Sequence, residues 1–369
     1  MRERSSAEEQ TTYPTLRRLA GAVVVLLAIS LPSLVAFSSI DAPLQAREIQ
    51  RVERALFPKP ESISEVTGLF YTATLSDAAI VGWPTQQSQI TVRARFSGMM
   101  ALFVISALVY LILAQVRGRA TGVAGSLSLA TMAPVAGSGF VLRPEQGATM
   151  FGLLGVALLV GLPVLLQRRP LDRFSLGGLM LVAGLMFGFA MSVHEQAWIY
   201  LALPALTLML AVLALVFLFP RATRGLPLAY WPSKAAARRY TPWMLVVLVC
   251  SAMSLWVLLQ AGGAADPSSI VSAAECRLFP RAWWWSAPLV GCAVVGGLRM
   301  GYGVSLRVQR LRRVRADSVL FLYVAALLMQ HFLSAESRDP LPAAVAMACL
   351  LGDGVMTAVV VTLSRVRRG

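Results

Sequence analysis

The residue best placed for chemistry is Asp41, which follows a long apolar run and begins a polar segment. A carboxylate at a lipid-water boundary can accept a hydroxyl proton, and such a base could serve an acceptor that attacks a lipid-linked donor. The alternative role is structural, because an acid at this point can also mark the membrane boundary or cap a following helix. Asp41 is therefore a candidate general base.

Three further polar residues lie between apolar runs that we expect to open on the same side as Asp41. Arg143 and Glu145 flank a proline, and His194 follows the apolar run that begins near residue 174. An arginine holds phosphate through charge-assisted hydrogen bonds, and an imidazole can donate to phosphate or bind it as a cation. The alternatives are a solvated loop acid for Glu145 and a polar turn between two spans for His194.

Two ionisable residues lie inside apolar runs rather than at their ends. Arg299 lies toward one end of its run, and Asp353 stands between two glycines near the middle of the last run. A charge inside a membrane is costly unless it is paired or hydrated. We therefore expect Arg299 and Asp353 to form a structural intramembrane pair.

The composition identifies the class of protein that positions these residues. The 369 residues are 57% hydrophobic and 14% charged, more apolar than a soluble core of this length requires. The net charge of +15 would suggest nucleic acid in a soluble protein, but here the basic residues lie in short clusters between apolar runs. The cysteines show no C-x-x-C spacing, and the sequence contains no P-loop, G-x-G-x-x-G, H-E-x-x-H or G-x-S-x-G motif.

The sequence predicts an all-α polytopic membrane protein with about ten transmembrane helices. The apolar runs lie near residues 19–40, 98–116, 121–141, 148–167, 174–193, 197–219, 241–261, 283–304, 317–334 and 341–364. The run at 121–141 is rich in small polar residues and contains Pro134, so it could be a broken or re-entrant segment that lines a cavity. We divide the chain into an N-terminal tail (1–18), a membrane module (19–220) and C-terminal membrane helices (221–369).

Basic residues predict how these spans are oriented. Most of the 33 Lys and Arg fall on alternate connections, which places both termini in the cytoplasm of a multi-pass protein of the cell (inner) membrane. The long segment 41–97 then faces outward, with Asp41 at its start. Within it, residues 44–57 have helical apolar spacing and arginines, including Arg47, that could lie on a membrane surface and reach lipid phosphates.

This order of parts resembles the GT-C membrane glycosyltransferases, a group that includes protein O-mannosyltransferases and lipid A aminoarabinose transferases. The shared pattern is a first span, an acid at its outer exit, a surface helix in a long outer loop, and the stretch Arg93 to Gly98 leading into the second span. The turn around Arg143 to Glu145 and the span that ends at His194 are also similar to segments of that family. The resemblance covers residues 19 to 220.

The resemblance implies an inverting transfer of a sugar from a polyprenyl-phosphate donor on the outer face. Asp41 would be the catalytic base, Glu145 a second acid, and His194, Arg143 and Arg47 would hold the donor phosphate. The sequence departs from the family where Ala42, Glu145 and His194 replace the usual Glu, Asp and Lys, and it lacks a large outer domain.

The resemblance also leaves several features open. The implied partners are the lipid-linked donor and membrane lipids; the acceptor, further subunits and any divalent metal stay open. Two other functions remain: a transporter or flippase, which needs several polar residues at mid-depth, and a non-catalytic subunit of an envelope complex.

Overall fold

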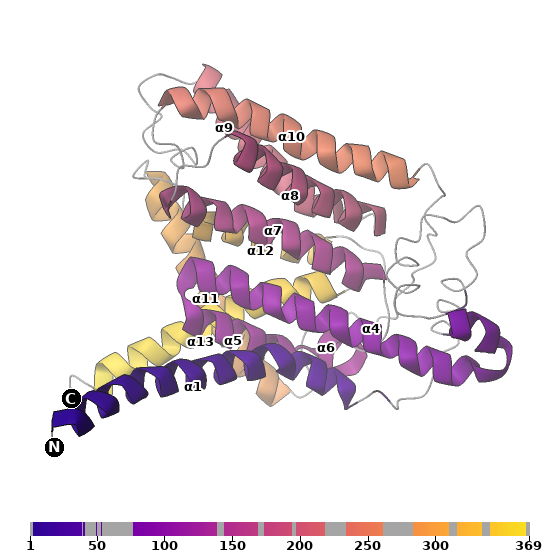
Figure 1. Ribbon diagram of the computed structural model, residues 1–369. Coiled ribbons are helices and arrows are strands. Elements are labelled where there is room, and N and C mark those ends of the chain that lie inside the picture. Colours follow the sequence, from indigo (N-terminus) through magenta and orange to yellow (C-terminus); the bar gives the residue numbers. More distant parts are fainter. Residues whose placement is uncertain are drawn as a thin grey trace.

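The chain forms a bundle of helices in the computed structural model (Figure 1). The structure describes residues 3–38, 40, 49, 53, 77–138, 144–168, 173–193, 197–217, 234–260, 283–309, 316–333 and 340–366. These residues contain no strand, so the described part of the chain is all-helical, as the sequence predicts. The helices are α1 (Glu3–Phe37), α4 (Asp77–Arg117), α5 (Arg119–Ala130), α6 (Ala133–Ser138), α7 (Pro144–Arg168), α8 (Arg173–Val193), α9 (Trp198–Phe217), α10 (Lys234–Gln260), α11 (Trp283–Gln309), α12 (Ala316–Leu333) and α13 (Leu341–Val366).

Several helices are membrane-spanning in length and composition. Within the described residues, four are long and apolar enough to cross a membrane: Arg18–Phe37, Thr85–Arg117, Ser175–Val193 and Leu341–Val366. Shorter apolar stretches lie in α7, α10 and α12. The protein is therefore a helical membrane protein, while the number of about ten spans stays a prediction. The N- and C-termini lie at the same end of the bundle (Figure 1).

Helix α4 differs from the sequence prediction. It begins at Asp77, well before the expected span at 98–116, so the last part of the expected loop 41–97 is helical. The polar residues between positions 85 and 97 suggested a loop, but they belong to a helix about 60 Å long. A kink at Gln86 (φ −126°, ψ 30°) follows Pro84, which cannot donate a helical hydrogen bond. Of the expected surface helix at 44–57, only Ile49 and Glu53 are among the described residues.

The segment expected at 121–141 is broken. Helix α5 ends at Ala130, Thr131 and Met132 form a turn, and the short α6 begins at Ala133. The twelve residues of α5 extend only about 18 Å, less than the hydrocarbon thickness of a bilayer. Helix α1 packs against α4, α5 and α6, so the broken segment supports the first span.

Glycines bring the helices of the bundle close together. A Cβ at Gly352 of α13 would lie 2.7 Å from the backbone nitrogen of Gly125 in α5, and one at Gly354 would lie 1.9 Å from the carbonyl oxygen of Cys292 in α11. In α8, a Cβ at Gly184 would lie 1.9 Å from the hydroxyl of Ser251 in α10. Small residues at such contacts allow the close backbone approach that stabilises helix pairs in membranes. The α5–α13 and α8–α10 contacts each join helices from opposite sides of residue 220, where the predicted module boundary lies.

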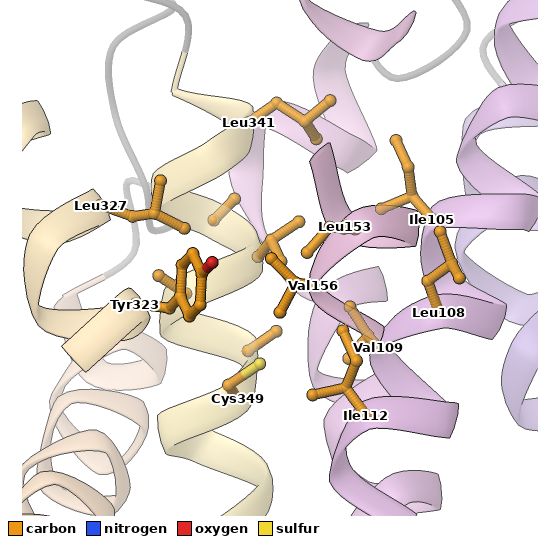
Figure 2. Close-up of a cluster of buried hydrophobic side chains, with 14 of the residues drawn as sticks. Ile105, Leu108, Val109, Ile112, Leu153, Val156, Tyr323, Leu327, Leu341 and Cys349 are labelled. Carbon is orange, nitrogen blue, oxygen red and sulfur yellow. The ribbon is translucent and has the colours of Figure 1, made fainter. Parts of the chain in front are cut away.

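The apolar core lies where α4, α7, α12 and α13 meet (Figure 2). Side chains from all four helices fill it: Ile105, Leu108, Val109, Ile112, Leu153, Val156, Tyr323, Leu327, Leu341 and Cys349. The hydroxyl of Tyr323 donates to the carbonyl oxygen of Tyr200 at 3.0 Å, which satisfies a polar group that burial would otherwise penalise. This core holds the second half of α4 and the middle of α7 in fixed relative positions.

Candidate functional site

The exit of α1 is fastened to α4 by contacts along both helices. The Ser33 hydroxyl donates to the carbonyl oxygen of Met99 at 3.1 Å. The rings of Phe37 and Phe96 are tilted at 56°, with their centroids 6.3 Å apart. These contacts hold the last turns of α1 beside the middle of α4.

The strongest contact at this junction comes from Arg95. Its guanidinium is almost completely buried, with 1% of the residue exposed, and its Nη1 donates to the carbonyl oxygen of Ile40. Helical phase explains the burial, because Thr91 and Met99, one turn before and after Arg95, are also buried, while Arg93 points outward. A charged donor buried this deeply is costly without acceptors, so the junction is built around its hydrogen bonding.

Arg95 was not among the site residues that the sequence suggested. The stretch Arg93 to Gly98 was expected to lead into a span, and two arginines two residues apart gave no sign of which one faces inward. The signal that could have separated them is helical phase, since Arg95 shares a face with Thr91 and Met99. This helical phase can be assigned only when residues 91–99 are known to form a helix.

Several site residues predicted from the sequence lie outside the described residues. These are Asp41, Arg47, Arg143 and His194. Asp41 follows Ile40 directly in the chain. The roles of these residues remain proposals.

Glu145 lies in a helix rather than in the expected connection. It is the second residue of α7, after Pro144, although its side chain is outside the description. Proline at the first helical position and an acid in the first turn are both favoured, because the missing N–H is not needed there and the helix dipole attracts negative charge. Both preferences agree with a helix that begins at Pro144.

The beginning of α7 lies against the end of α8. A Cβ at Gly147 would lie 3.6 Å from Cγ1 of Val193, the last residue of α8. Gln146 and Thr149 are buried in the same turns of α7. The first turn of α7, which contains Glu145, therefore lies close to the end of α8 at Val193. His194 is the next residue in the chain.

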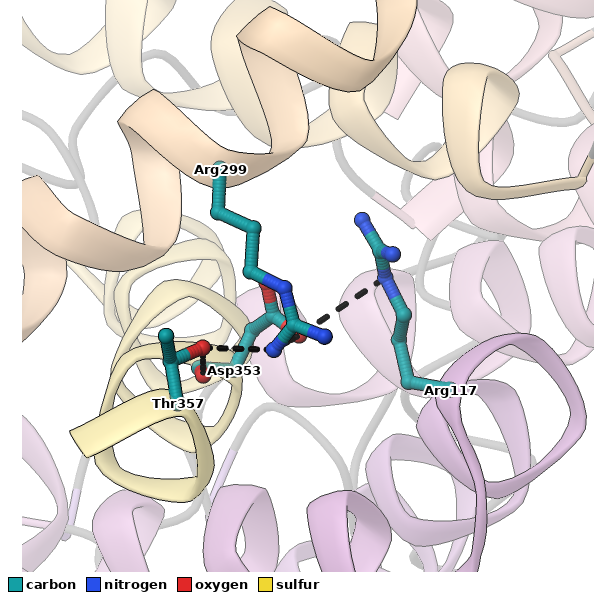
Figure 3. A network of polar contacts seen from close by, with 4 residues as sticks. All are labelled: Arg117, Arg299, Asp353 and Thr357. Atoms are coloured by element: carbon teal, nitrogen blue, oxygen red, sulfur yellow. Dashed lines mark hydrogen bonds and ion pairs between the residues drawn. The ribbon is translucent and has the colours of Figure 1, made fainter. Parts of the chain in front are cut away.

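A second polar group joins α4, α11 and α13 (Figure 3). Asp353 is fully buried, and its Oδ1 lies 3.4 Å from Nη1 of Arg299 and 3.6 Å from Nε of Arg117. The Arg299 guanidinium also donates to the hydroxyl of Thr357, which donates to the carbonyl oxygen of Asp353. The contact between Arg299 and Asp353 was expected from the sequence, whereas the contact of Arg117 with Asp353 was not.

The described residues contain no group of three or more His, Cys, Asp or Glu that could hold a metal ion. The carboxylates that the sequence placed near the donor, Asp41 and Glu145, have side chains outside that description.

No family model and no curated protein matches the sequence. Among solved structures, the fold is similar to that of the Archaeoglobus fulgidus oligosaccharyltransferase in its apo form, with a TM-score of 0.51 and 11% sequence identity. The similarity covers 91% of this chain but 50% of the other, so the chain spans half the length of that enzyme. The chain therefore has a helical membrane fold similar to that of half of this oligosaccharyltransferase.

Proposed function

We propose that the protein is a membrane glycosyltransferase that takes a sugar from a polyprenyl-phosphate donor and transfers it to an acceptor on the extracytoplasmic face of the cell membrane. Asp41 is the general base in this proposal. The fold shared with an oligosaccharyltransferase supports the class of reaction. The contact between Arg95 and Ile40 is the observation that supports the position of the base.

The Arg95 contact bears on Asp41 through the geometry of the peptide bond. The carbonyl oxygen of Ile40 belongs to the same planar group as the nitrogen and Cα of the next residue. A donor that holds this oxygen therefore restricts the orientation of the peptide group that joins Ile40 to Asp41. A catalytic base needs such restriction, because a displacement of about 1 Å from the reacting atom can cost about a hundredfold in rate.

The proposed reaction is a single displacement with inversion at the anomeric carbon. Asp41 accepts the acceptor's hydroxyl proton as the acceptor oxygen attacks that carbon. The bond from the anomeric carbon to the phosphate oxygen breaks, and the electron pair leaves with the polyprenyl phosphate. The group that holds the phosphate must then stabilise the developing negative charge.

Residues around the start of α7 are proposed to hold that phosphate. Arg143 and His194 supply donors and positive charge, and Arg47 adds a further guanidinium from the outer segment. The contact of Gly147 with Val193 supports this grouping, because Arg143 precedes the former and His194 follows the latter within a few residues. Glu145 is proposed as the second acid of the site.

The Asp41→Asn variant tests the proposed base. We expect transfer to fall by about a hundredfold to ten-thousandfold, because the amide cannot accept the proton, while the protein still inserts in the membrane. The measurement is release of polyprenyl phosphate from a panel of polyprenyl-phosphate hexoses and pentoses in membranes that contain the full chain. Glu53→Gln, an exposed acid of the same outer segment, is the matched control and should retain activity. Normal turnover by Asp41→Asn would remove the base assignment.

The charged cluster favours a second candidate function, a transporter or flippase. Such a protein needs polar groups at depth on facing helices, and Arg117, Arg299 and Asp353 come together from α4, α11 and α13. Proteoliposomes separate the two functions. A flippase would move the lipid-linked sugar across the bilayer without cleaving it, and its activity would depend on Asp353 rather than on Asp41.

A non-catalytic subunit is the remaining alternative, favoured by Ala42 where the family carries a second acid. Mass spectrometry of the purified protein addresses it directly. Our proposal expects a bound polyprenyl lipid that Asp41→Asn retains, since the base is not needed for donor binding. A partner subunit would show no such lipid and no turnover in isolation.

A further inference from the structure

We propose that Thr149 binds the phosphate of the polyprenyl-phosphate donor through its side-chain hydroxyl. This inference rests on the proposed function and adds a residue to the donor site. Thr149 lies in the second turn of α7, four residues after Glu145 and six after Arg143. Its hydrogen bonding, its direction and its depth in the bundle support the assignment.

The hydroxyl of Thr149 lacks the partner that similar hydroxyls have. The residue is 1% exposed, and its Oγ1 forms no hydrogen bond among the described residues. Elsewhere, helical hydroxyls donate to the carbonyl oxygen four residues earlier, as those of Thr91 and Ser192 do at 2.7 Å. Thr149 does not use the carbonyl of Glu145 in this way. A hydroxyl that is removed from water without a partner is costly, so we expect a bound molecule to supply one.

The side chain of Thr149 is directed toward the start of α7. Side chains of an α-helix lean toward its N-terminus, so this side chain covers the turn that contains Glu145. The first N–H groups of a helix have no partner within it, and the helix dipole places partial positive charge there, which favours phosphate. Pro144 has no N–H to offer. The hydroxyl of Thr149 supplies a donor in its place.

The depth of Thr149 favours contact with the phosphate rather than with the sugar. The apolar stretch of α7 begins at Gln146 and ends at Gly161, so Thr149 lies near one end of it. Leu153, one turn farther along the same face, already belongs to the apolar core (Figure 2). A polyprenyl-phosphate sugar keeps its isoprenoid chain among apolar groups, so its phosphate lies where these groups end and its sugar lies beyond them.

The separation of Thr149 from Arg95 leaves room for a sugar between the phosphate and the proposed base. The labelled residues of α4 and α7 follow each other in the same direction through the core (Figure 2). A Cβ at Gly161 of α7 would lie 3.4 Å from Oε1 of Gln115 in α4, which sets the register. Thr149 is twelve residues before Gly161 and Arg95 is twenty before Gln115, so Arg95 lies about 12 Å farther toward the exit of α1. Inversion requires the base and the phosphate on opposite sides of the sugar, as this separation allows.

Native mass spectrometry of the full chain in detergent tests the contact, with a polyprenyl phosphate added either alone or carrying a hexose. Thr149→Val keeps the shape of the side chain without the hydroxyl, and we expect it to weaken binding of both lipids about tenfold. Thr149→Ser keeps the hydroxyl and should retain most of the affinity. The matched control is Ser106→Ala, which should leave binding unchanged. Ser106 is also buried, with an Oγ that forms no hydrogen bond among the described residues, but it lies beside Ser126 of α5 rather than at a helix end.

Thermal unfolding without added lipid separates a ligand-binding hydroxyl from a structural one. Replacing an unpartnered hydroxyl by a methyl group is nearly neutral or stabilising, so the unfolding midpoint of Thr149→Val should not fall. A lower midpoint would show that the hydroxyl has an internal partner, such as a trapped water, and would overturn the proposal.

The binding data can also contradict the proposal. Unchanged affinity in Thr149→Val, an equal loss in Thr149→Ser, or a loss confined to the lipid that carries the hexose would overturn the phosphate contact. The proposed function fails separately, because normal turnover by Asp41→Asn removes the base and leaves the Thr149 contact in place. An unaltered chain that binds neither lipid would remove both.

Discussion

Two arginines of α4 are held in opposite ways. Near the middle of the helix, Arg95 is buried and donates to a neutral backbone carbonyl, that of Ile40. At its end, Arg117 shares the buried carboxylate of Asp353 with Arg299. The first arrangement fixes a point of the backbone at the exit of α1, and the second ties three helices to one another.

The difference shows what each arrangement can be used for. A carbonyl acceptor carries no net charge of its own, so the contact with Arg95 fixes the backbone at Ile40, the residue before the proposed base. A carboxylate acceptor is different, because removing either partner leaves a buried charge uncompensated. We therefore expect the Arg95 junction to matter more for activity and the Asp353 cluster more for stability.

The largest effect on stability is expected for Asp353→Ala. The change leaves Arg117 and Arg299 without their shared counter-charge and should lower the free energy of unfolding by about 3–5 kcal/mol. Thermal unfolding of the detergent-solubilised protein measures it. In the double variant Asp353→Asn with Arg299→Gln, which removes one charge of each sign, part of that loss should be recovered. Unchanged unfolding of Asp353→Ala would show that the cluster does not hold the helices together.

The second-largest effect on stability is expected for Arg95→Ala. Loss of the charged donor and of the buried side chain should lower the free energy of unfolding by about 2–4 kcal/mol. Turnover distinguishes the two arginines further. We expect kcat to fall more than KM rises, because Arg95 is proposed to position the base rather than to bind substrate. Arg93→Gln is the control, since Arg93 is exposed on the same helix. An equal loss of activity in both variants would contradict a specific role for Arg95.

A smaller effect is expected where helix packing alone is changed. Gly354→Ala places a methyl group against the carbonyl of Cys292 and should cost about 1–3 kcal/mol by forcing α11 and α13 apart. The same movement would draw Arg299 away from Asp353. Gly291→Ala in α11 is the control, because no atom lies within 4 Å of a Cβ there. Equal melting temperatures for the two variants would mean that close approach does not support the cluster.

Much of the architecture follows from the sequence alone. Long apolar runs require helices in a membrane, where every backbone polar group must be bonded within the chain, and the composition of 121–141 already suggested a broken segment. The beginning of α4 was missed because its polar residues hide a helical face, of which Arg95 is part. The candidate site was predicted only as residue types at the ends of spans. The sequence does not give the distance in space between two residues that lie far apart in the chain.

The sequence by itself determined the class of the protein: a helical membrane chain with ionisable residues at the ends and inside of its apolar runs. Only the tertiary structure decided which arginine is buried and what it contacts. Arg93 and Arg95 are alike in type, but helix α4 turns one outward and the other toward Ile40. Likewise, Arg117 joins Asp353 because glycines let α5, α11 and α13 approach closely. Hydropathy depends on local composition, whereas the partner of a buried charge depends on how distant helices pack.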